Sequence, residues 1–101
     1  MTIDSQSLKI NNNEAQHRFE AHIDGQTAFL EYLLAREQIV YTHTEVPQNL
    51  EGQGIASQLA HTALEYAREK QLKVLPLCPY TAAYIRRHPE YKPLLRPGIN
   101  V

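Results

Sequence analysis

A short glycine-containing stretch, Glu51 to Ser57, constrains the fold of this chain more than any other feature. Two glycines, Gly52 and Gly54, stand one residue apart, directly before a segment with helical periodicity. Glycine permits the close backbone approach and the unusual conformations that a turn around an anion requires. A helix that begins here exposes unpaired N–H groups and the positive end of its dipole. The stretch therefore predicts a loop that binds a phosphate group at the start of a helix.

The segment after the glycines predicts a helix from about Gly54 to Lys70. Apolar residues recur there at helical spacing and form a broad stripe that can face a core. The members of this stripe are Ile55, Ala56, Leu59, Ala60, Ala63, Leu64, Tyr66 and Ala67. A strand precedes the loop and ends at Pro47, and a second strand, Leu72 to Leu77, follows the helix. This order predicts a right-handed parallel crossover. Because Pro76 cannot donate to a sheet ladder, the two strands should separate near their ends and leave a gap for a ligand.

The first half of the chain predicts an antiparallel meander. Alternating polar and apolar residues indicate half-buried strands over 17–23, 26–34 and 38–46. Asp24-Gly25 predicts a tight hairpin between the first two, and residues 35–37 predict the next turn. Residues 8–10 are expected to form a short edge strand that ends in a turn at the three asparagines, 11–13.

The C-terminal part predicts a short helix from about Thr81, a plausible cap, to Arg87, ended by His88-Pro89. Residues 1–7 and 96–101 are expected to be loose. The predicted fold is therefore one α+β domain over residues 1–101, an antiparallel meander followed by a strand–helix–strand crossover and a short C-terminal helix. At 101 residues the chain is long enough for a single core.

Composition excludes several classes of protein. The net charge of −1 disfavours nucleic-acid binding, because it provides no basic surface. The lone cysteine, Cys78, excludes an internal disulfide and a cysteine-cluster metal site, and the five histidines show no metal-ligand spacing. No apolar run is long enough to span a membrane and no leader opens the sequence, so the expected compartment is the cytoplasm.

These motifs together resemble the GNAT acetyltransferase superfamily, and most closely its small single-domain subfamily. The resemblance covers about Phe19 to Leu95. Three segments carry it, namely residues 43–47, 52–56 and 77–89, and the last is specific to the subfamily. In the superfamily the loop begins with Gln or Arg, whereas this chain has Glu51 at that position.

The resemblance implies a minimal GNAT fold that binds acetyl-CoA in a cleft between two splayed parallel strands. The pyrophosphate is expected on the N–H groups of the glycine loop, and the pantetheine arm is expected to pair with the main chain near Glu45 and Val46. The residues that the resemblance implies for cofactor binding are Val46, Gly52, Gln53, Gly54, Ile55, Ala56, Ser57, Pro79, Tyr84 and Arg87.

The expected catalytic residues are Cys78, Glu45, Tyr84 and His43, and each also has a purely structural interpretation. Cys78 is either a small buried apolar residue or a nucleophile that accepts the acetyl group. Glu45 is either a solvated charge or the general base, and His43, which should share its strand face, is a second candidate for proton transfer. Tyr84 either packs in the core or protonates the leaving CoA thiolate. Arg86 and Arg87 form a solvated helix face or contact the 3′-phosphate of CoA.

Two functional hypotheses follow. In the first, the protein is an N-acetyltransferase that moves acetyl to an unidentified amine, directly or through Cys78. In the second, it is a CoA-binding module with little catalysis that acts with a partner protein or as a homodimer. The chain lacks the N-terminal helices that form the acceptor pocket in larger superfamily members, which supports the second hypothesis or implies that a partner completes the site. A third reading, an orphan α+β interaction domain, requires the glycine loop to be accidental.

Overall fold

The computed structural model describes residues 8–101, so the expectation for residues 1–7 lies outside the described part. Five strands form one sheet in chain order, β1 to β5. The first four strands pair antiparallel, and β5 joins β4 in parallel. The elements are β1 (Ile10–Asn13), β2 (Arg18–Ile23), β3 (Gln26–Ala35), β4 (Gln38–Glu45), the 3-10 helix η1 (Gln48–Leu50), α1 (Ile55–Lys70), β5 (Lys73–Pro76), α2 (Pro79–Arg87) and the 3-10 helix η2 (Pro89–Leu94). This is the predicted α+β meander and crossover.

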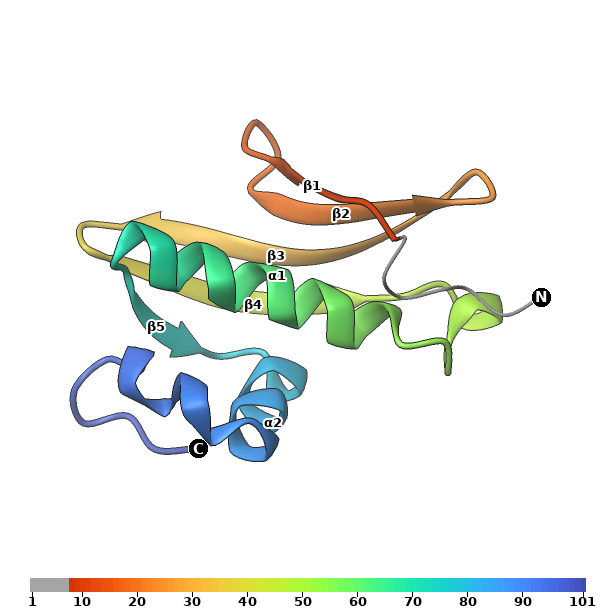
Figure 1. Cartoon of the computed structure of the whole chain (residues 1–101). Coiled ribbons are helices and arrows are strands. Elements are labelled where there is room, and N and C mark those ends of the chain that lie inside the picture. The colour runs from red at the N-terminus through yellow and green to blue at the C-terminus, as the bar shows by residue number, and fades with distance from the viewer. Residues whose placement is uncertain (1–7) are drawn as a thin grey trace.

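The long helix α1 lies along one face of the sheet, and α2 and η2 lie beyond β5 (Figure 1). The alternation predicted for β2 to β4 determines which side chains meet α1, because successive residues of a strand point to opposite faces. Those on the α1 side are buried, as is the apolar stripe of the helix. The core includes Phe19, Ala21, Ala28, Leu30, Tyr32, Ile39, Tyr41, Ile55, Leu59, Ala60, Ala63, Leu64, Ala67, Val74 and Ile85.

Several local predictions are confirmed. Asp24 and Gly25 both adopt positive φ in the hairpin between Ile23 and Gln26, as a two-residue turn that follows strand twist requires. The helix α1 begins one residue after Gly54 and ends at Lys70. His88 ends α2, directly before Pro89.

The prediction for the asparagines is wrong, because they lie within β1 rather than in a turn after it. Tertiary hydrogen bonds override their turn preference: the Tyr32 hydroxyl donates to Asn12 at 2.7 Å, and the Asn13 side chain donates to Glu20 at 3.2 Å. Glu20, which was expected on the outer face, does lie there but is only 3% exposed. Its carboxylate contacts Arg18, and although burial raises the pKa of Glu20, the hydrogen bonds from Arg18 and Asn13 lower it overall.

The prediction that Thr81 caps the second helix is also wrong. The helix begins at Pro79, Cys78 is its N-cap, and Thr81 lies buried in the first turn. Proline favours the first position of a helix because its fixed φ suits the helix and its missing N–H costs nothing there. The strand before it is shorter than expected, Lys73–Pro76.

The C-terminal tail, expected to be loose, contacts the edge of the sheet. The Arg96 N–H donates to the Val74 carbonyl at 2.9 Å, and Leu95 forms a parallel bridge with Val74. Val101 packs against the core. Among residues 8–101 there is no helix of the length and apolar character needed to cross a bilayer.

Candidate functional site

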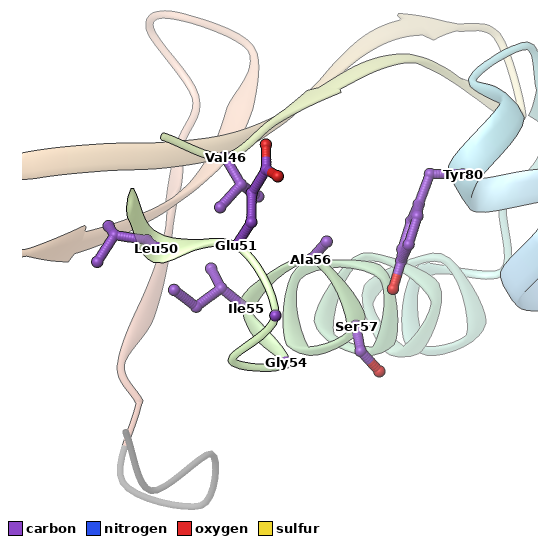
Figure 2. A pocket seen from close by; sticks show the side chains of 9 residues that line it. Val46, Leu50, Glu51, Gly54, Ile55, Ala56, Ser57 and Tyr80 are labelled. Atoms are coloured by element: carbon purple, nitrogen blue, oxygen red, sulfur yellow. The ribbon is translucent and has the colours of Figure 1, made fainter. Parts of the chain in front are cut away.

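A pocket of about 230 Å³ lies where β4 ends and α1 begins (Figure 2). Six of the expected cofactor-binding residues line it, namely Val46, Gly52, Gly54, Ile55, Ala56 and Ser57. Leu50, Glu51 and Tyr80 complete the lining, and none of these three was among the expected cofactor-binding residues. Figure 2 shows the Tyr80 ring facing the first turn of α1, across the pocket from Val46 and Glu51. Pro79 was the sequence signal that could have predicted this position, because a helix that begins at Pro79 has Tyr80 in its first turn.

The first-turn amides of α1 donate to no acceptor among residues 8–101. Gly54 is the N-cap with φ 81°, no side chain caps the helix, and the first helical bond runs from Gln58 N–H to the Gly54 carbonyl. The N–H groups of Ile55, Ala56 and Ser57 therefore have no helical partner. The N–H groups of residues 52–54 donate to no backbone carbonyl within the described residues either. The amides are free to bind an anion.

The glycine positions also leave space in front of the backbone. A Cβ placed on Gly52 or Gly54 would meet no heavy atom within 4 Å, and both residues have φ 81°. Next to them, the Gln53 carboxamide oxygen is buried without a hydrogen-bond partner in the described part of the chain. Open space and free amides fit a ligand rich in oxygen atoms, as a diphosphate is, whereas the Gln53 oxygen is itself an acceptor.

Glu51 is the charge that opposes such a ligand. Its side chain is exposed and, in Figure 2, its carboxylate extends beside Val46 and away from the turn at Gly54. The negative charge therefore lies at the rim of the pocket and leaves the amides accessible.

The predicted separation of the parallel strands is present. The pairing of β4 with β5 runs from Gln38–Lys73 to Tyr41–Pro76, and the Cys78 N–H then donates to the Tyr41 carbonyl at 2.9 Å. Beyond this point β4 continues to Glu45, while the other segment turns into α2. The end of β4 consequently has β3 on one side and no described strand on the other.

A β-bulge at Thr42 decides which side chains face this gap. Glu31 pairs with His43 and Tyr32 pairs with Tyr41, so Thr42 is the extra residue on β4. A bulge re-aims the side chains that follow it. Thr44 contacts Cys78 on one side of the strand, and His43 and Glu45 project to the other. The sequence carries no glycine or proline that would have predicted this bulge.

Cys78 lies at the separation point, only 3% exposed, and does not line the pocket. Its sulfur lies 3.3 Å from the Thr44 hydroxyl oxygen. Burial raises the pKa of the Cys78 thiol, but the Thr44 hydroxyl and the nearby donor groups of Thr81 and Tyr80 at the start of α2 outweigh burial, so the pKa lies below its ordinary value. A lowered pKa increases the fraction of thiolate, which is the nucleophilic form.

His43 and Glu45 share one face of β4, as predicted, and His43 Nε2 lies 3.8 Å from Glu45 Oε1. Both side chains are more than half exposed, and the Phe29 ring packs edge-on against His43 with centroids 6.1 Å apart. The pair can accept protons from a solvent-side amine. The pair does not touch Cys78, because Cys78 contacts Thr44, whose side chain lies on the opposite side of β4.

Tyr84 and the arginines of α2 lie outside the pocket lining. Tyr84 is 8% exposed and stacks on His88 with ring centroids 4.1 Å apart. Burial raises the pKa of Tyr84, so its phenol stays protonated. Pro79, Arg86 and Arg87 are exposed, and the described residues form no ion pair with either arginine within the distance limit of a salt bridge.

A larger hollow of about 420 Å³ lies between α1 and the edge formed by β1 and β2. Glu65 and Glu69 line it together with Phe19 and Tyr66. Two carboxylates and the middle of a helix, where amides are already paired, make it unsuitable for a diphosphate. Within residues 8–101, no three His, Cys, Asp or Glu side chains converge to hold a metal ion.

Comparison with known proteins identifies the family. The model of the GCN5-related N-acetyltransferase domain matches residues 18–94. Protein NATD1 of Xenopus tropicalis is 28% identical over 98 residues, covering 92% of this chain and 90% of the relative. Protein NATD1 of Homo sapiens is 32% identical over 95 residues, covering 89% of this chain and 84% of the relative. The relative of the same name in Danio rerio is 26% identical over 92 residues.

Proposed function

The chain belongs to the GCN5-related N-acetyltransferase family, and on that premise we propose that it transfers an acetyl group from acetyl-CoA to an amine. The observation that carries the proposal is the run of unpaired amides at the start of α1, which opens into the pocket beside Gly52 and Gly54. These groups are what a diphosphate needs, and they lie beside the gap between β4 and β5.

In this proposal the N–H groups of Gln53, Gly54, Ala56 and Ser57 hold the pyrophosphate, and the Gln53 carboxamide can turn its NH₂ toward a phosphate oxygen. The main chain near Glu45 and Val46 pairs with the amides of the pantetheine arm, because this side of β4 has no described strand partner. Tyr80 closes the pocket opposite Val46. Ile55, which lines the pocket, and Pro79, Tyr84 and Arg87, which do not, remain proposed contacts.

Bound acetyl-CoA would supply an activated thioester. The Cys78 thiolate attacks the acetyl carbonyl carbon and forms a new carbon–sulfur bond, and the bond to the CoA sulfur breaks. The Tyr84 phenol is the proposed proton donor to the departing CoA thiolate. The amine then attacks acetyl-Cys78 and gives its proton to Glu45 or His43, and the cysteine leaves as thiolate.

The acetyl adduct tests this route. Incubation with acetyl-CoA followed by intact mass should show one acetyl group on the wild-type protein and none on Cys78→Ala. The chain contains a single cysteine, so the assignment is unambiguous. An adduct that survives Cys78→Ala rules out the thioester route, whereas no adduct combined with amine acetylation supports direct attack.

The burial of Cys78 favours a second candidate function. A sulfur that is 3% exposed cannot contact a thioester unless the side chains above it move. In this second candidate the protein acts mainly as a CoA-binding module with a partner protein or a second copy. Both candidates predict that acetyl-CoA raises the melting temperature, because a ligand that binds only the folded state stabilises it. Release of free CoA thiol over a panel of amines separates them, since only the transferase releases it catalytically.

A further inference from the structure

The first turn of α2 contains a hydroxyl group that has no partner. Thr81 is 0% exposed, and its Oγ1 makes no hydrogen bond within the described part of the chain. A buried hydroxyl without a partner is costly, so its presence calls for an explanation. Thr81 is the third residue of α2, the helix that Cys78 caps, and its hydroxyl contributes to the lowered pKa of the Cys78 thiol.

Cys78 occupies the N-cap position of the same helix, and its side chain makes no capping hydrogen bond there. An N-cap side chain normally accepts a hydrogen bond from the N–H of the second or third residue of the helix. Those residues are Tyr80 and Thr81, while Pro79 at the first position has no N–H. A neutral thiol is a poor acceptor, but a thiolate accepts well and does not donate. The cap is therefore incomplete while the sulfur carries its proton.

A fourth donor comes from the sheet. The Thr44 hydroxyl lies 3.3 Å from the sulfur, brought there by the bulge at Thr42. The position of the sulfur is fixed independently, because the Cys78 N–H donates to the Tyr41 carbonyl at 2.9 Å. The Thr44 hydroxyl thus contacts the sulfur from the sheet, while the Thr81 hydroxyl and the N–H groups of Tyr80 and Thr81 lie in the first turn of the helix that Cys78 caps, without a hydrogen bond to the sulfur.

We infer that Thr44 and Thr81, with the first-turn amides of α2, form a built-in donor set for the Cys78 thiolate. Loss of the thiol proton gives the Thr81 hydroxyl an acceptor and completes the cap of α2. The two threonines are positioning residues that act through Cys78. The inference deepens the proposed function, since it explains how the sulfur becomes a nucleophile without a neighbouring base.

The charged groups around the sulfur do not provide an alternative cause. On β4, His43 and Glu45 project to the opposite side of the strand. On α2, Tyr84 stacks on His88, and Arg86 and Arg87 are exposed in the last turn. Lys73 lies exposed at the far end of β5, and the first turn of α1 contains no acidic residue. The lowering of the Cys78 pKa follows, after burial is overcome, from hydrogen bonds rather than from a cation.

The test is the pH titration of the ultraviolet thiolate absorbance of the free protein, with Cys78→Ala as the blank, because this readout does not require a reagent to reach a buried sulfur. We expect a midpoint below the ordinary value of about 8.5 for the wild type. Thr44→Val and Thr81→Val, which keep the side-chain shape and remove the hydroxyl, should each raise the midpoint by roughly one unit, a tenfold loss of thiolate at neutral pH. Thr44→Ser should retain the wild-type midpoint.

Thr62→Val is the matched control, because Thr62 lies in the middle of α1 and lines the hollow beside β1 and β2 rather than contacting the sulfur. Its midpoint should equal that of the wild type. Equal midpoints for the wild type, Thr44→Val and Thr81→Val would overturn the inference. Should Thr81→Val fail to fold, Thr44→Val against Thr44→Ser decides alone. The titration needs no acetyl-CoA, so a shifted midpoint without an acetyl adduct retains the donor set and removes the proposed thioester route.

Discussion

The protein presents two helix starts of opposite character. At α1 the cap is a glycine, the amides are free, and the surrounding space is an open pocket. At α2 the cap is the buried Cys78, Thr81 is buried in the first turn, and the Thr44 hydroxyl lies 3.3 Å from the sulfur. Both use the same property, the unpaired N–H groups of a helix start. The difference in enclosure suits the first to a large external anion and the second to a single internal one.

One residue of β4, Tyr41, connects α1 to the start of α2. The Tyr41 hydroxyl donates to the Ala63 carbonyl in the middle of α1, and the Tyr41 carbonyl accepts the Cys78 N–H. The side chain is fully buried, and burial raises the pKa of its phenol far above the ordinary value, so it remains a donor. The relative position of the pocket and the sulfur therefore depends on this tyrosine.

The largest expected effect comes from placing a charge in the open helix start. Ala56→Glu puts a carboxylate in the pocket, where it repels a diphosphate, although an acidic residue in the first turn stabilises the helix itself. We expect acetyl-CoA binding to weaken about 100-fold, ~2.8 kcal/mol, by isothermal titration. Ala35→Glu, the same change at an exposed strand end, should bind normally. Unchanged affinity of Ala56→Glu would contradict the location of the diphosphate. A substitution at Gly54 is a poorer test, because its positive φ makes any side chain strained.

The next effect concerns the connection between the two regions. Tyr41→Phe removes the hydroxyl and leaves the ring, so the protein should lose about 1–2 kcal/mol of stability in urea unfolding. Tyr66→Phe is the control, since the Tyr66 hydroxyl forms no hydrogen bond within the described residues and is partly exposed. If the two variants unfold at the same urea concentration, the Tyr41 hydroxyl does not hold α1 in place.

The thiol at the start of α2 should make the stability of the protein depend on pH. The folded-state pKa of Cys78 lies below its ordinary value, so the unfolded chain binds more protons between the two values. Stability should therefore rise with pH from the folded pKa up to about 8.5 and level off above it. Each unit of depression corresponds to ~1.4 kcal/mol. The difference in melting temperature between the wild type and Cys78→Ala should change with pH over this range in favour of the wild type, and should be constant below the folded pKa, where the thiol is protonated in both states. Parallel curves would show that the thiol does not contribute.

The two regions also differ in how well the sequence predicted them. The open helix start was predictable because every determinant is local: two glycines, a helical stripe and a preceding strand ended by proline. The enclosed one depends on contacts between distant segments. Thr44 reaches Cys78 only because of a bulge that pairs Glu31 with His43, and no local residue encodes that shift. Pro79 did carry a signal for the true helix start, but the preference of Thr81 for a cap position concealed it.

The first strand teaches the same lesson. Three consecutive asparagines favour a turn on local grounds. The Asn12 side chain instead bonds Tyr32 on β3, and the Asn13 side chain bonds Glu20 on β2. Neither partner is a sequence neighbour of the asparagines. Patterns of burial and turn residues therefore predicted the sheet and the crossover. Specific polar contacts between distant segments determined where the elements begin and which hydrogen-bond donors lie near Cys78.

The smallest expected effect is that of the Glu51 charge, at the rim of the pocket, on the affinity for acetyl-CoA. Glu51 stands where the superfamily has Gln or Arg, and its exposed carboxylate extends away from the free amides. Solvent screens an exposed charge strongly, so Glu51→Gln should tighten acetyl-CoA binding only about threefold. The gain should shrink as salt is added, because screening already removes most of the repulsion. Glu69→Gln, an exposed residue in the last turn of α1, removes the same charge far from the pocket and should leave the affinity unchanged. A gain that is independent of salt would mean that Glu51 acts on the shape of the loop rather than through its charge.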